Sequence, residues 1–276
     1  MKVVFLNQRL LARAIKGLVV AFCALLLVDN VAQSLVGGAR LASGDVARSV
    51  VGIVGAHGAR ARSFCTATAI AQDLLLTAGH CMQQDVNYKV QHGGRDGSRT
   101  YSDIVRWERP SQFAALKTGP VADLALLKLA KPLPADIGIA TLDLRHAPVW
   151  PGDRFIVVGE GITLPGLRET GFNRTANLVA AASFTDRQIR LVNPSGSSNA
   201  EGACAGDSGA PVFQQQSDGT NVVVGVVSWA IGPDHTKGCG GITGATLLTP
   251  YRRWIEETTD KLKRYTDDGS RPAPVR

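Results

Sequence analysis

Short runs of hydrophobic residues, each four to eight residues long, recur along most of the chain after residue 34. They are rich in Val, Ile, Leu and Thr, and turn-forming pairs such as Pro151-Gly152 and Asp218-Gly219 separate them. Many short strands punctuated by turns are typical of a β-sandwich or a β-barrel. The predicted strands are 49–56, 65–70, 74–77, 124–129, 154–158, 188–192, 211–214, 222–229 and 246–249.

One segment has the features of a helix, from near Pro250 to about Arg264. Proline suits the first turn of a helix, and the Lys/Arg cluster at the far end complements the helix dipole. Residues 265–276 are polar and rich in proline, so they are predicted to form a disordered tail. The proline-bearing stretch 131–151 is predicted to join two halves of the molecule.

The N-terminal 34 residues have the layout of an export signal. An apolar run over residues 17–28 follows four basic residues, and its twelve residues are too few to span a bilayer. Small residues at Ala32 and Ser34 predict cleavage after Ser34. The alternatives are an uncleaved membrane anchor and a buried helix. The four basic residues are Lys2, Arg9, Arg13 and Lys16.

Composition narrows the class of protein further. The chain has 276 residues, of which 45% are hydrophobic, so it can bury a sizeable core. Its 30 glycines and low aromatic content of 6% favour an all-β fold over a helical one. The formal charge of +7 falls to about +4 without residues 1–34. No Lys/Arg run is interleaved with aromatics, so nucleic acid is not a predicted partner.

The cysteines indicate an oxidising compartment. Of the five, Cys23 lies in the apolar N-terminal run and would leave with the signal. The remaining even number predicts disulfides, although the count alone leaves all three pairings open. The chain has no C-x-x-C pair and no carboxylate cluster, so neither a metal nor another cofactor is predicted. The four remaining cysteines are Cys65, Cys81, Cys204 and Cys239.

Three segments carry candidate chemistry: residues 77–81 (TAGHC), 123–129 (DLALLKL) and 202–211 (GACAGDSGAP). They resemble the motifs T-A-x-H-C, D-[IL]-A-L-L-x-L and G-D-S-G-x-P of the chymotrypsin-like (trypsin-like) serine peptidases, in the same order. Taken singly, each segment could be a core histidine, an aspartate before a strand or a glycine-rich turn. Together they are specific, and the resemblance covers roughly residues 35–258.

The resemblance implies an all-β fold of two six-stranded Greek-key β-barrels packed together, with a C-terminal helix, over residues 35–264. It also implies a catalytic triad. A serine hydroxyl needs a neighbouring base to attack a carbonyl, and a carboxylate holds that base in the correct tautomer. Ser208 is therefore the expected nucleophile, His80 the general base and acid, and Asp123 the orienting carboxylate. An α/β-hydrolase elbow would require glycine at position 210, which is Ala210.

The family resemblance assigns further residues around the nucleophile. Backbone N–H groups of Gly206 and Ser208 are expected to form the oxyanion hole. The family pairing of cysteines implies the disulfides Cys65–Cys81 and Cys204–Cys239. One departure is Gly79, where the family usually has alanine; the smaller residue is expected to fit, with some loss of local rigidity.

The resemblance also suggests how the protein is activated. Family members insert a new N-terminus, often Ile-Val-Gly-Gly, whose ammonium pairs with the aspartate before the catalytic serine. Here the matching residues are 35–38 (LVGG), with Leu35 as the new N-terminus and Asp207 as its partner. Because Leu35 follows the predicted export cut, signal removal alone is expected to create the activating N-terminus.

The primary specificity pocket is expected from the same resemblance. Gly202 occupies the position where trypsin-like members carry an aspartate, so cleavage after Arg or Lys is not expected. The alternative is that Glu201 or Asp234, both nearby in sequence, restores an acidic pocket. Ala230 replaces a common glycine, which narrows the pocket and favours a small or medium apolar side chain. The residues expected to form the pocket are Gly202, Ala203, Ser228, Trp229, Ala230 and Gly244.

These features predict a secreted, monomeric serine endopeptidase, extracellular or periplasmic, that acts on protein or peptide substrates. No stable membrane association is expected after signal removal. Two alternatives remain open. One is a catalytically silent binding module with the same fold, because fold does not dictate function. The other is a protease tethered to the membrane by an uncleaved segment 17–28.

Overall fold

The computed structural model describes residues 35, 39–57, 60–93, 98–116, 119–145, 148–160, 173–182, 185–196, 201–233 and 239–265. The predicted export signal, and all of the predicted tail except its first residue, lie outside these ranges. Within them, no helix has both the length and the apolar character needed to cross a membrane.

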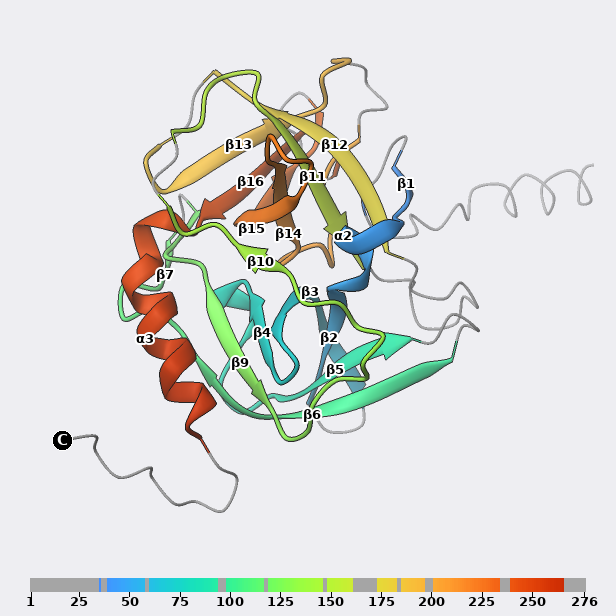
Figure 1. The fold of residues 1–276 in the computed structure, drawn as a ribbon, viewed down its shortest axis with the longest axis vertical. Coiled ribbons are helices and arrows are strands. Elements are labelled where there is room, and N and C mark those ends of the chain that lie inside the picture. The colour runs from blue at the N-terminus through green and yellow to red at the C-terminus, as the bar shows by residue number, and fades with distance from the viewer. Residues whose placement is uncertain are drawn as a thin grey trace, which may run out of the picture. The chain divides into compact units, whose positions relative to one another are not determined.

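Six antiparallel strands close the first barrel in the order β2-β3-β4-β9-β6-β5 (Figure 1). Strands β4 and β9 are wholly buried and, apart from Thr77 and Lys128, apolar. Strand β5 alternates buried and exposed positions because only one of its faces meets the barrel interior. The strands are β2 (Val50–His57), β3 (Arg60–Ala71), β4 (Leu74–Thr77), β5 (Asn87–Gly93), β6 (Arg99–Glu108) and β9 (Ala125–Leu129).

The second barrel has the strand order β12-β11-β14-β15-β16-β13, and pairing of β13 with β12 closes it. The predicted all-β fold of two six-stranded barrels is therefore confirmed. The strands are β11 (Arg154–Gly159), β12 (Arg174–Ala180), β13 (Gln188–Val192), β14 (Pro211–Gln215), β15 (Asn221–Ile231) and β16 (Ile242–Leu247).

Short strands complete the sheets. Strand β1 (Arg40–Leu41) pairs with β12, and β7 (Ala114–Leu116) pairs with β8 (Gly119–Val121). Strand β10 (Thr141–Leu142) belongs to the connection between the barrels and runs parallel to β15. This connection, between the end of β9 and the start of β11, includes the predicted junction at 131–151.

Most predicted strands agree with observed strands to within a few residues, and 74–77 and 188–192 agree at both ends. The strand predicted at 246–249 differs, because β16 ends at Leu247 and a 3₁₀ turn, η3 (Thr249–Tyr251), follows. Among the barrel strands, β5, β6 and β12 are absent from the prediction, as are the short strands β1, β7, β8 and β10. The outward-facing polar residues of β5, β6 and β12 dilute the apolar signal, and no residue of β6 is fully buried.

The predicted helix is present as α3 (Arg252–Lys263), directly after η3; one five-residue helix, α2 (Gly44–Arg48), was not predicted. Although α3 follows the second barrel in sequence, it lies beside β9 and β4 of the first (Figure 1). Ile255 and Leu262 are buried in the first barrel's core. Lys261 Nζ reaches Glu108 on β6 at 2.8 Å, so the C-terminal helix fastens onto the first barrel.

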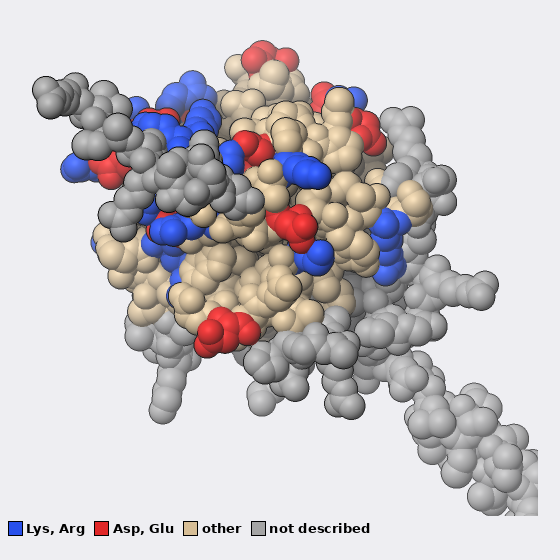
Figure 2. Space-filling model, turned by 90° about the horizontal axis from the view of Figure 1, so that it is seen from below, with Lys and Arg blue, Asp and Glu red and all other residues tan. Residues whose placement is uncertain are grey.

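A second hydrophobic core fills the second barrel and includes Leu35, which is completely buried. On the face shown in Figure 2, Lys and Arg side chains are interspersed with Asp and Glu, and other residues cover much of the surface between them. The charge displayed on this face is therefore of both signs.

Candidate active site

Asp123 is the centre of a hydrogen-bonded cluster between the barrels. Its carboxylate is completely buried. Oδ2 lies 2.7 Å from His80 Nδ1 and accepts a 2.5 Å hydrogen bond from Ser228 Oγ, while Oδ1 accepts the backbone N–H of His80 at 2.8 Å. The histidine side chain itself remains one-third exposed. The carboxylate thus fixes both the ring and the main chain of an accessible imidazole.

Local structure explains why these groups meet. His80 lies on a single 3₁₀ turn, η1 (Gly79–Cys81), which follows β4, and Asp123 comes just before β9. Strands β4 and β9 are paired neighbours, so their ends bring the two residues together across 43 positions of sequence. A disulfide between Cys65 on β3 and Cys81 ties η1 to the barrel.

Ser208 lies on a tight turn before β14 whose backbone requires glycine. Gly206 and Gly209 have φ values of +95° and +87°, in the region that disfavours other residues. A Cβ on Gly209 would lie 2.1 Å from Thr66 O and 3.1 Å from Ala78 N. The turn is therefore packed directly against the segment that leads into His80. Cys81 Sγ is 4.0 Å from His80 Nε2 and 3.7 Å from Ser208 O, so the imidazole and the serine backbone both lie near this sulfur.

Asp207 precedes the serine and is also completely buried. Its Oδ2 accepts hydrogen bonds from the backbone nitrogens of Leu35 and Cys204, each at 2.9 Å. Leu35 is 172 residues away in sequence, yet its side chain lies in the second barrel's core. Leu35 is thus connected to the serine turn through one carboxylate.

The sequence model of the family described as Trypsin matches residues 35–255. The chain belongs to the trypsin family. Trypsin of Sarcophaga bullata is 30% identical over 217 residues, covering 72% of this chain and 80% of that protein. The vitellin-degrading protease of Bombyx mori is 24% identical over 221 residues, covering 72% and 77%.

Solved structures of low sequence identity share the trypsin-family fold. Human heparin binding protein has a TM-score of 0.62 at 22% identity, covering 87% of this chain and 100% of that one. Neuropsin, a serine protease from mouse brain, has a TM-score of 0.61 at 18% identity, covering 81% and 99%. These similarities support the two-barrel architecture.

Three segments of this trypsin-family chain meet where the specificity pocket is expected. The Cys204–Cys239 disulfide joins the serine loop to the segment before β16. A Cβ on Gly202 would lie 2.8 Å from Gly240 Cα, so the two backbones are in close contact. Ala230 on β15 pairs with Thr243 on β16, which brings the third segment alongside.

Thr243 is a residue of this region that the motifs did not indicate. Its side chain is buried, and Oγ1 accepts the backbone N–H of Ala203 at 2.9 Å. Successive residues of a strand face opposite sides, so Gly244 faces away from Ala203. The Gly244 backbone packs against the indole of Trp229. A Cβ at position 244 would lie 2.0–2.4 Å from the indole ring atoms. The structure thus puts Thr243, rather than Gly244, opposite Ala203. Only the strand register reveals this.

A buried hydroxyl supports the expected oxyanion loop. Thr66 on β3 donates its Oγ1–H to Gly206 O at 2.9 Å, and its backbone N–H donates to Ser208 O at 2.8 Å. The Thr66 hydroxyl oxygen, Oγ1, also accepts the backbone N–H of Glu160 at 3.3 Å, and Thr77 Oγ1 donates to Thr66 O at 2.7 Å. Thr66 therefore fastens the serine loop of the second barrel to the wall of the first.

Glu160 is a buried carboxyl where the two barrels meet, and it is only 8% exposed. Gln91 donates to its Oε1 at 3.4 Å, Oε2 has no hydrogen-bond partner among the described residues, and Gly52 leaves the space that the carboxyl occupies. Burial raises the pKa of Glu160 to about 8, against smaller opposing effects from Gln91 and Arg99. At neutral pH the group is therefore mainly protonated.

This raised pKa predicts that stability falls as the pH rises from about 4.5 to about 8. Between pH 4.5 and about 8 the folded protein holds a proton that the unfolded chain releases, so the free energy of unfolding falls as pH rises. In Glu160→Gln the amide mimics the neutral acid and removes this dependence. We expect the free energy of unfolding of Glu160→Gln, relative to that of the parent, to increase by about 1.4 kcal/mol per pH unit across that interval. Urea denaturation from pH 5 to 9 measures it.

The matched control for this prediction is Glu257→Gln, which makes the same chemical change on the exposed face of α3, where Glu257 pairs with Arg253. Its stability difference from the parent should be constant over the same pH range. A flat difference for Glu160→Gln as well would show that the Glu160 carboxyl is ionised in the folded protein.

One group of metal-ligand types occurs in the described part of the chain: Cys65, His80 and Cys81. Both sulfurs are joined in the disulfide, so they offer no thiolates to a metal. The chemistry available at this site is that of the imidazole, the carboxylate and the neighbouring serine.

Proposed function

We propose that the protein is a secreted serine endopeptidase that cleaves peptide bonds through an acyl-enzyme intermediate on Ser208. The observation that carries the proposal is the buried Asp123 carboxylate, which binds the ring and backbone of His80 and the hydroxyl of Ser228 at once. A buried carboxylate that fixes an exposed imidazole beside a serine is the arrangement that nucleophilic catalysis requires.

In the proposed mechanism, Ser208 Oγ attacks the substrate carbonyl carbon while His80 Nε2 accepts the hydroxyl proton. The carbonyl oxygen becomes an oxyanion, which the backbone N–H groups of Gly206 and Ser208 stabilise. His80 then gives its proton to the leaving amine, and an acyl-enzyme forms. Water, activated by the same histidine, attacks the ester and releases Ser208. The Asp123 carboxylate stabilises the imidazolium.

The proposed location is outside the cytoplasm, extracellular or periplasmic, with residues 1–34 removed as a signal and 35–264 forming the peptidase domain. Two disulfides among the described residues fit an oxidising compartment. The buried position of Leu35 and its contact with Asp207 fit an N-terminus created there. We propose that the enzyme acts as a monomer on proteins or peptides.

The proposed specificity is for a small apolar residue before the scissile bond. Ala203 and Gly202 supply no charge for an Arg or Lys side chain, and the Thr243 side chain fills space opposite Ala203. A glycine at 243 would enlarge this region. We expect Thr243→Gly to raise kcat/KM for phenylalanine relative to alanine at that substrate position by at least about 10-fold. Peptides that differ at that position alone measure the change.

Thr243→Ser is the control for this specificity prediction. Serine keeps a hydroxyl that can accept the Ala203 N–H and loses only a methyl group. The preference for phenylalanine over alanine should therefore change less in Thr243→Ser than in the glycine variant. If Thr243→Gly leaves the preference between phenylalanine and alanine unchanged, Thr243 does not line the specificity pocket.

Labelling with a fluorophosphonate, followed by intact-mass analysis, tests the proposed function. We expect one adduct on the protein that begins at Leu35 and none on Ser208→Ala, because the reagent requires an activated serine. The starting mass also separates a cleaved chain from one tethered by segment 17–28. A folded protein that begins at Leu35 and stays unlabelled would instead support the catalytically silent binding module.

A further inference from the structure

Arg109 occupies an unusual place beside the turn that carries His80. It follows β6, and its Nη1 donates to two backbone oxygens, Gly79 O at 3.4 Å and Met82 O at 3.0 Å. These carbonyls lie at the start and just past the end of η1. Among the described residues no carboxylate forms an ion pair with Arg109, so its polar contacts are directed at the His80 turn.

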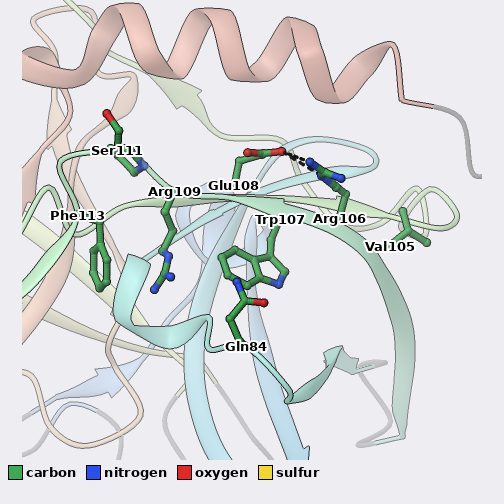
Figure 3. A pocket seen from close by; sticks show the side chains of 9 residues that line it. Gln84, Val105, Arg106, Trp107, Glu108, Arg109, Ser111 and Phe113 are labelled. Carbon is green, nitrogen blue, oxygen red and sulfur yellow. Dashed lines mark hydrogen bonds and ion pairs between the residues drawn. The ribbon is translucent and has the colours of Figure 1, made fainter. Parts of the chain in front are cut away.

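Aromatic rings hold the guanidinium in this position. Its carbon lies 4.4 Å from the centroid of the Phe113 ring and 5.0 Å from that of Trp107. Figure 3 shows the Arg109 side chain running between the two rings, while the paired Glu108 and Arg106 point to the other side of the strand. A planar guanidinium can stack on rings and donate from its edge at the same time, which an ammonium cannot.

Phe113 connects this cluster to the unusual glycine of the motif. A Cβ on Gly79 would lie 2.8 Å from Phe113 Cδ2 and 2.9 Å from Leu124 O. The phenylalanine ring therefore occupies the space that a methyl group at position 79 would need. Gly79 lacks the rigidity of alanine, and the ring and the arginine supply external support to the same peptide.

The geometry points to Arg109 as a positioning residue for His80, an inference that rests on the proposed peptidase function. His80 meets Asp123 through its main-chain N–H as well as its ring, so any displacement of η1 disturbs both hydrogen bonds. Arg109 donates hydrogen bonds to carbonyls at both ends of that turn, and Phe113 packs against Gly79, its first residue. Neither side chain needs to touch the substrate.

The experiment compares Arg109→Gln and Arg109→Lys with Arg106→Gln. Arg106 lines the same pocket of about 640 Å³ but pairs with Glu108, and among the described residues it has no hydrogen bond or ion pair with η1, so it controls for loss of charge. In Arg109→Gln we expect kcat to fall by about 10- to 100-fold with KM nearly unchanged, since misplacing a reacting group by 1 Å can cost about 100-fold. Arg109→Lys keeps the charge and the aliphatic stem, so it provides a folded test if the glutamine variant is unstable; it should show a smaller loss of the same kind.

A second measurement reads the position of His80 without catalysis. The proton shared by His80 Nδ1 and Asp123 should give a low-field NMR signal, which we expect to broaden or disappear in Arg109→Gln and to persist in Arg106→Gln. If folded Arg109→Gln and Arg109→Lys keep both kcat and this signal, or if Arg106→Gln loses as much, the inference is overturned. A parent protein that shows the signal but does not label at Ser208 would contradict the proposed function alone, and the NMR comparison would still decide the role of Arg109.

Discussion

Asp123→Asn is expected to lower kcat by about 10⁴-fold while the protein remains folded. The carboxylate accepts three hydrogen bonds, from His80 N, His80 Nδ1 and Ser228 Oγ. Asparagine has one accepting oxygen and one donating NH₂ group, so it cannot accept all three. If its NH₂ faces Nδ1, the imidazole must carry its proton on Nε2, where it can no longer accept one from Ser208. Steady-state hydrolysis of a peptide substrate measures the loss.

Asp143→Asn is a suitable control for that experiment. Asp143 is also buried, but it pairs with Arg145 in the connection between the barrels. Loss of the Asp143 carboxylate should lower the stability of the protein and leave kcat within about twofold of the parent value. A value of kcat for Asp123→Asn within tenfold of the parent would show that the carboxylate does not set the histidine tautomer, and the proposed mechanism would fail.

A protein that begins at Leu35 is expected to be about 100- to 4000-fold more active than one that retains Ser34. With a preceding residue, the Leu35 nitrogen is a neutral amide that donates one hydrogen bond to Asp207. As a free N-terminus it becomes an ammonium, which neutralises a carboxylate with no exposed surface. Breaking a buried ion pair costs about 3–5 kcal/mol, and each 1.4 kcal/mol corresponds to a factor of ten.

The ammonium of Leu35 is expected to affect Ser208 through the geometry of the loop that contains Asp207. Asp207 also accepts the Cys204 N–H and directly follows Gly206, so a change in its contact with Leu35 would disturb the expected oxyanion donors. Asp207→Asn in the protein that begins at Leu35 should reproduce the low activity, while Leu35→Ile, which keeps the ammonium and the apolar side chain, should remain active. Equal activity of the two N-terminal forms would contradict activation by signal removal and leave the Leu35 contact a purely structural one.

The most local features of the molecule were predictable from the sequence alone. Apolar runs and turn residues indicated barrel strands because burial and backbone geometry restrict which residue types occur at neighbouring positions. The segments containing His80, Asp123 and Ser208 could be found because each motif is contiguous. The disulfide pairs came from the family resemblance, since four cysteines allow three pairings that no local signal separates.

Contacts between distant segments required the tertiary structure. The register of β15 against β16 placed Thr243 opposite Ala203 and turned Gly244 towards Trp229. The meeting of the two barrels buried Glu160, which in the sequence is one acidic residue among many.

The same limit explains the supports around His80. Nothing in the sequence near Gly79 indicates that Phe113 fills the missing methyl space or that Arg109 reaches the carbonyls of the turn. The sequence by itself indicated which residues are expected to carry the proposed chemistry and determined what class of fold holds them. Only the folded chain decided what holds those residues in place, because burial and hydrogen-bond partners depend on strand pairing between segments that are far apart in sequence.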